Sequence, residues 1–143
     1  MPDATTLNNS LFFLLQRTFF NKLKLQTGLR FDSRALTSKS LGEEGQPDYR
    51  MALDKNYKSL SGSLGSTYYL TQKLLIRANF AAAYRAPNLS ELTANGQHET
   101  RYEIGDQDLV PEKSFEIDLS MHYHIDNLTL DLAGFYNNIN DFI

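Results

Sequence analysis

The side chains best suited to chemistry lie close together in one polar segment of the sequence. His98, Glu99 and Tyr102 occur there within a stretch rich in Asn, Gly and Gln. Imidazole binds iron, copper and zinc, and a tyrosine can hold ferric haem iron. The segment is therefore a candidate ligand-binding site, with His98 as the candidate metal ligand. The alternative interpretation is that His98 only forms hydrogen bonds within a folded loop.

A second pair of imidazoles, His122 and His124, follows the acidic residues Glu116 and Asp118. Residues two apart on a strand project from the same face, so both rings can reach one ion. We favour the simpler interpretation that they belong to a polar lining, because polar residues alternate with apolar ones throughout this stretch.

Several classes of function are not indicated by the sequence. The chain has no cysteine, and we find no serine nucleophile motif, no His-Glu-x-x-His zinc motif and no phosphate-binding loop. We therefore expect no enzyme activity and no intrinsic cofactor. The 14 Lys and Arg residues are scattered and the net charge is −3, so we expect no nucleic-acid partner.

Alternation of apolar and polar residues dominates the chain and predicts β-strands. From Leu23 to Asp32, the odd positions hold three leucines, Thr27 and Phe31, while Lys24 and Arg30 are among the even ones. The pattern recurs over residues 59–70, 74–85, 115–125 and 128–133. A first strand is expected near Leu11–Phe20, where both faces are apolar and cannot be assigned. The sequence thus predicts an all-β chain of about six antiparallel strands in a meander.

The predicted connections alternate strictly between short and long. Three are short, near Asn21, Gln72 and Asn127, and two are long, spanning Ala35–Asn56 and Ala86–Glu112. Outer-membrane barrels have short periplasmic turns and long extracellular loops, so the pattern favours a fragment of a transmembrane β-barrel in contact with lipid. No apolar run is long enough for a membrane-spanning helix. A soluble β-sheet module for binding or adhesion is the alternative.

Two motifs delimit the second long connection. The first reads Tyr84-Arg85-Ala86-Pro87 and is followed by Asn88-Leu89-Ser90-Glu91-Leu92. The second runs from Gly105 to Ser114 and includes Leu109, Pro111 and Glu112. Pro87 should end a strand, and Asn88 with Glu91 should form a capping box for a short helix over Leu89–Ala94. Arg85 is expected to pair with carboxylates inside the barrel or on a plug.

These motifs, with Phe135–Ile143 and Gly28–Asp32, closely resemble the late-barrel region of TonB-dependent receptors. The resemblance covers about Leu11 to Ile143. It implies that residues 1–143 are part of a barrel of roughly 22 strands, with the remaining strands and an N-terminal plug outside this sequence. In haem receptors of this superfamily a ligating His lies between two such boxes, and His98 is in the matching place. The second box here reads Asp106-Gln107-Asp108-Leu109, and its first two positions depart from that pattern.

The resemblance also implies a function and a place in the cell. The intact protein would be an outer-membrane receptor of a Gram-negative bacterium that imports a scarce metal complex, such as an iron-siderophore, haem or a metal ion. Its partners would be membrane lipid, the small metal-complex ligand and a TonB-type energy-coupling protein that acts through the plug. The same architecture could instead import cobalamin or glycans.

Overall fold

The computed structural model describes residues 3–46, 49–98 and 100–143, with only the backbone at position 98. Its main feature is a six-stranded antiparallel sheet with the strand order β1-β2-β3-β4-β7-β8, in which only the small β5–β6 hairpin interrupts the sequence order. The strands are β1 (Ala4–Phe19), β2 (Leu23–Ser38), β3 (Leu53–Tyr69), β4 (Leu74–Arg85), β7 (Glu112–Ile125) and β8 (Leu128–Asn140). The prediction of an all-β meander is confirmed.

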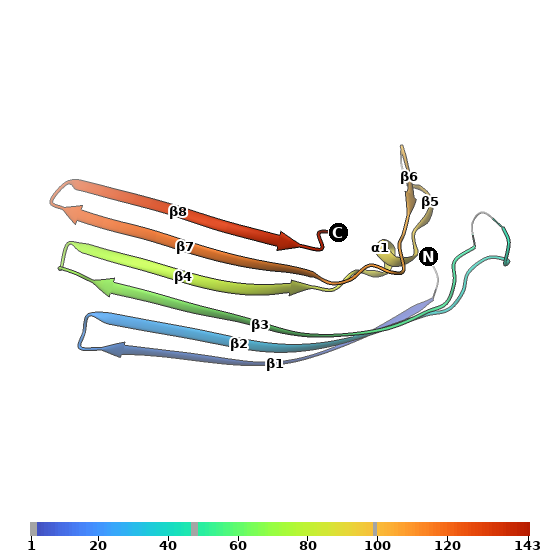
Figure 1. The fold of residues 1–143 in the computed structure, drawn as a ribbon, viewed down its shortest axis with the longest axis horizontal. Helices are drawn as coiled ribbons and strands as arrows, with labels where there is room; N and C mark the ends of the chain where they lie inside the picture. The colour runs from blue at the N-terminus through green and yellow to red at the C-terminus, as the bar shows by residue number, and fades with distance from the viewer. Residues whose placement is uncertain (1–2, 47–48, 99) are drawn as a thin grey trace.

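The two ends of the sheet differ in construction (Figure 1). Three short turns join strands at one end, here called the turn end. The opposite loop end carries residues 39–46 and 49–52, the helix α1 (Leu89–Thr93) and a small hairpin of β5 (Asn95–His98) and β6 (Arg101–Ile104). The predicted alternation of short and long connections is therefore present. No helix in the described residues is long and apolar enough to cross a membrane.

The first long connection is shorter than predicted. We expected it over Ala35–Asn56, but β2 continues to Ser38 and β3 already begins at Leu53. The first strand likewise begins at Ala4 rather than near Leu11. These extensions carry many polar residues, so they do not show the clean alternation of the middle of the sheet. Backbone pairing between neighbouring strands maintains them nonetheless.

Strand register fixes which residues share a face. Opposite residues of an antiparallel pair project from the same side, and the paired positions give one apolar and one polar face. Leu29 pairs with Gly62, Leu64 with Phe80, and Ala78 with Leu119 on the apolar face. On the polar face lie the following residues: Lys24, Gln26, Arg30, Asp32, Arg77, Asn79, Asp118 and His122.

Register also assigns the faces of β1. Leu11 pairs with Phe31 and Phe13 with Leu29, so both lie on the apolar face. Phe12 pairs with Arg30 and Leu14 with Gly28, so these two apolar residues lie on the polar face. The sequence alone could not separate the two sets.

The turn between β1 and β2 contains an unusual residue. Phe20 and Asn21 both have positive φ, and the Lys22 amide donates to the Phe19 carbonyl at 3.0 Å. Positive φ at both central residues is the signature of a type I′ turn, which matches the twist of a hairpin. A phenylalanine rarely adopts this conformation, and Phe20 is 94% exposed.

A small hydrophobic core lies at the loop end, on the polar face of the sheet. It is formed by Leu36 of β2, Leu53 of β3 and Leu92 of α1, all buried, with Leu89 and Leu109 packed against them. The helix is therefore anchored onto the ends of β2 and β3. This core holds the first part of the second long connection in a fixed place.

Candidate functional site

The base of the second long connection is organised around Arg85, the last residue of β4. Its Nη1 donates to both carboxylate oxygens of Glu91, at 2.9 and 3.1 Å. Its Nε lies 3.8 Å from an oxygen of Glu112, the first residue of β7. Arg85 therefore links the end of one strand, the helix and the start of the next strand.

The capping box predicted for α1 is present. The Asn88 side chain accepts from the Glu91 amide at 2.9 Å, and the Glu91 carboxylate accepts from the Asn88 amide at 2.9 Å. Burial of Glu91 favours the neutral acid, but the Asn88 amide and the Arg85 guanidinium outweigh it and lower the pKa of this carboxyl. The helix spans Leu89–Thr93, one residue shorter than predicted.

Gly105 closes the helical part of the loop. Its amide donates to the Ala94 carbonyl at 2.6 Å, and the Asp106 amide donates to the Glu91 carbonyl at 2.8 Å. A Cβ at position 105 would lie 2.6 Å from the amide nitrogens of Thr93 and Ala94. Only glycine fits this close approach, which explains why the second motif begins with one.

The other motif residues occupy defined places around this base. Pro87, two residues after the end of β4, is fully buried, and Ala86 and Tyr84 line a cavity on the polar side. Leu109 packs against the small core, while Pro111 immediately precedes β7 and Glu112 begins it. The two motifs thus surround the start and the end of the loop.

The candidate ligands lie on the hairpin of β5 and β6, which projects from this base (Figure 1). The backbone places His98 opposite Arg101 and Tyr102 opposite Gln97. The Tyr102 hydroxyl donates to the Asn95 side chain at 2.8 Å. Glu99 and the imidazole of His98 lie outside the described part of the chain, so the ligand set His98, Glu99 and Tyr102 stays a prediction.

The first loop supports the hairpin through a residue that the sequence did not single out. The Arg50 Nη2 donates to the Asn95 carbonyl at 2.8 Å, and the Asn95 side chain donates to the Tyr49 carbonyl at 3.4 Å. Arg50 lies in a segment without periodicity or a recognisable motif. The contact between the two loops depends on the fold, and no local sequence pattern indicates it.

The two histidines of β7 have local hydrogen-bond partners. His122 Nδ1 lies 2.6 Å from Asp131, and His124 Nδ1 lies 2.8 Å from Thr129, both on β8. Among the side chains that the structure describes, no group of three or more His, Cys, Asp or Glu is placed to hold a metal ion. These contacts agree with a polar lining.

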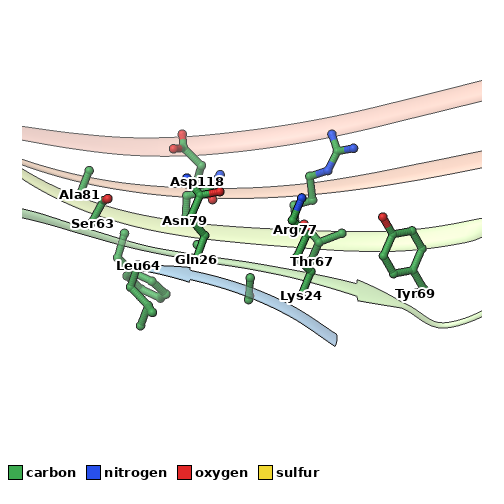
Figure 2. A pocket seen from close by; sticks show the side chains of 13 residues that line it. Lys24, Gln26, Ser63, Leu64, Thr67, Tyr69, Arg77, Asn79, Ala81 and Asp118 are labelled. Atoms are coloured by element: carbon green, nitrogen blue, oxygen red, sulfur yellow. The ribbon is translucent and has the colours of Figure 1, made fainter. Parts of the chain in front are cut away.

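The polar face also carries a cavity of about 400 Å³ nearer the turn end (Figure 2). One row of paired residues crosses the sheet here. Gln26 of β2 pairs with Gly65 of β3, which pairs with Asn79 of β4, and Asn79 pairs with Asp118 of β7. Lys24 and Arg77 belong to the adjacent row through Thr67. The polar face therefore presents charged and amide groups at this cavity.

A family model described as "TonB dependent receptor-like, beta-barrel" matches residues 1–143. The chain belongs to the TonB-dependent receptor family. TonB-dependent receptors are proteins of the Gram-negative outer membrane, so the apolar face of this receptor contacts lipid and the polar face lines the barrel interior. The alternative of a soluble module is wrong, because the chain is part of a membrane barrel.

One curated relative of the receptor is the vitamin B12 transporter BtuB of Vibrio vulnificus (strain CMCP6), 28% identical over 88 residues. That match covers 62% of this chain and 12% of the relative. The receptor sequence therefore spans a small part of the length of this relative.

Solved structures show the same fold. The copper transporter OprC matches with a TM-score of 0.79 and 21% identity, over 98% of this chain and 22% of that one. The hemophore receptor HasR of Serratia marcescens, solved with its hemophore HasA and heme, matches with a TM-score of 0.78 and 18% identity, over 94% and 25%. The ferric yersiniabactin receptor FyuA of Yersinia pestis matches at 0.68 and 20%, over 97% and 21%. At such identities these matches establish the architecture alone.

Proposed function

We propose that the intact protein binds a scarce metal complex at the cell surface and imports it through its barrel, driven by a TonB-type partner. Residues 1–143 would supply a six-strand sector of that barrel. Membership of the receptor family and the polar interior face support the proposal. The chemistry would be binding and gating, without an enzyme reaction, an intrinsic cofactor or a nucleic-acid partner.

The observation that carries the proposal is the fixed base of the second loop. Arg85, Glu91 and Gly105 hold the helix against the barrel wall, and the first loop contacts the hairpin through Arg50. A hairpin on a rigid base can present ligands in a constant geometry, which lowers the entropic cost of binding. His98 is the residue on that hairpin whose side chain best suits a metal or haem.

Import of cobalamin is the second candidate. It is favoured by the sequence match to a vitamin B12 transporter. Import of glycans uses the same architecture but has no comparable match among the proteins described above. A direct binding assay separates these ligands because a receptor saturates only with its own substrate class.

The test uses the full-length receptor with binding isotherms for haem, zinc, copper, a ferric siderophore and cobalamin. If His98 ligates the metal, His98→Ala should weaken binding tenfold or more, which is about 1.4 kcal/mol. His122→Ala is the matched control, because His122 is engaged by Asp131 on the barrel wall. Equal affinity of the His98→Ala variant and the parent for the bound ligand would remove His98 from the site.

A further inference from the structure

A second cavity on the interior face, of about 530 Å³, lies nearer the loop end than the one in Figure 2. Arg30, Arg34, Tyr57, Ser59 and Ser61 are among the residues that line it. Its volume is in the range of pockets that bind small molecules. Leu36, two residues beyond Arg34 on β2, belongs to the buried core under α1, so the cavity lies close beneath the helix.

Two buried hydrogen-bond donors in this cavity have no partner in the described chain. Tyr57 is only 9% exposed, and its hydroxyl is buried without a hydrogen-bond partner. The Nε of Arg34, on the residue directly opposite in the β2–β3 register, is also buried and unpartnered. Buried donors are almost always satisfied in folded proteins, because leaving them unpaired costs free energy.

The acidic groups nearby are already engaged. Asp32 accepts from the Arg30 guanidinium at 2.8 to 2.9 Å and from the Ser10 hydroxyl at 2.5 Å. Glu91 forms hydrogen bonds with Arg85 and within its own helix cap, and the charge of Arg34 also helps to lower the pKa of this carboxyl. Arg30 is therefore paired with Asp32, while the Arg34 Nε and the Tyr57 hydroxyl remain unpaired donors side by side. That pair suits an oxygen acceptor with negative charge.

We propose that Arg34 and Tyr57 form a binding site for an anionic oxygen group, a carboxylate or a phosphate, in the barrel interior. The group has two possible sources. It belongs either to a small molecule that enters from the loop end or to an Asp or Glu side chain from another part of the full-length receptor. The site depends on the barrel fold and not on which metal complex the receptor imports.

The first measurement is calorimetric titration of the purified full-length receptor with citrate and with inorganic phosphate. If the source is diffusible, at least one probe binds, and Arg34→Gln and Tyr57→Phe each weaken it tenfold or more. Arg77→Gln is the matched control, because Arg77 is an interior arginine that lines the other cavity; it should leave the affinity unchanged. Arg34→Lys keeps the charge and should retain part of the binding. Thermal melting of each variant shows whether the barrel is folded.

The second measurement is the structure of the full-length receptor with citrate present. Either source predicts an anionic oxygen within hydrogen-bond distance of the Arg34 Nε or the Tyr57 hydroxyl. An internal source places an Asp or Glu of the receptor there, and neither probe then binds. Water or neutral groups alone on both donors would overturn the proposal, as would probe binding that Arg34→Gln and Tyr57→Phe leave unchanged. Failure of metal-complex import, by contrast, would not affect it.

Discussion

Gly105 bears the tightest backbone contact at the loop base. A Cβ there would lie 2.6 Å from two backbone nitrogens, which cannot move as a flexible side chain can. We predict that Gly105→Ala loosens the loop at a cost of about 1–3 kcal/mol, the usual range for overpacking. Protease cleavage of the loop on intact cells should accelerate while the amount of displayed barrel stays constant.

Gly134→Ala is the control for that change, because nothing lies within 4 Å of a Cβ at position 134. Gly134 lies on the lipid-facing side of β8, far from the second long connection. Equal protease sensitivity of both variants would show that the close approach at Gly105 does not hold the loop.

Glu91 makes the stability of the loop base depend on pH. Its pKa is lowered in the folded state although burial opposes this, because the Asn88 amide and Arg85 stabilise the carboxylate. A lowered folded-state pKa adds stability above the unfolded-state pKa, and that stability is lost as the pH falls through the folded-state pKa. The melting temperature of Glu91→Gln should therefore lie below the parent at about pH 7, and the two should converge in acid. A constant difference across this range would contradict the linkage.

Residues with local signals were predictable, and residues that depend on register were not. Asn88 and Glu91 have the three-residue spacing of a capping box, so the cap could be read directly. Arg34 and Tyr57 are 23 positions apart, and only the β2–β3 register places them opposite each other. His98 remains a prediction from its residue type and place, because the geometry of its imidazole is outside the described structure.

At the level of elements, the middle of each strand was predictable and the ends were not. An apolar band about 25 Å tall needs only about 10 residues per strand, whereas β1, β2 and β3 have 16, 16 and 17 residues. The additional residues extend these strands beyond the apolar band, where lipid no longer imposes an alternation of apolar and polar side chains. This is why residues 35–38 and 53–56 were assigned to a loop although they pair as strands.

The orientation of the elements can be tested by labelling. Cysteines introduced at Glu44 and Gln97, both exposed at the loop end, should react with an impermeant reagent on whole cells. Cysteines at Gln72 and Asn127, exposed at the turn end, should not react until the outer membrane is opened. The reverse pattern would mean that the turns face outward.

At the level of the whole molecule, the sheet separates two environments. Leu119 is 58% exposed on the apolar face, whereas the adjacent Ser120 pairs with Arg77 on the interior face. We predict that Leu119→Arg destabilises the intact barrel by about 2–4 kcal/mol, the cost of a cation near the middle of the bilayer. Ser120→Arg should cost less, because the interior face is polar.

Folding titrations in lipid vesicles measure both variants. Similar losses at positions 119 and 120 would show that the alternation does not divide lipid from interior. This comparison is independent of the ligand, because neither residue lies near the loop end.

The register between neighbouring strands of the sheet constrains how this sector of the barrel can evolve. An insertion of one residue within β7 would exchange the two faces for the rest of the strand, so Asp118 or His122 would enter the hydrocarbon and Leu119 would turn inward. Selection should therefore remove length changes from the strands and tolerate them in residues 39–52 and around the tip of the β5–β6 hairpin. Related receptors can then diversify at the cell surface through changes in the length and sequence of their loops. The number of residues in the barrel wall stays almost constant.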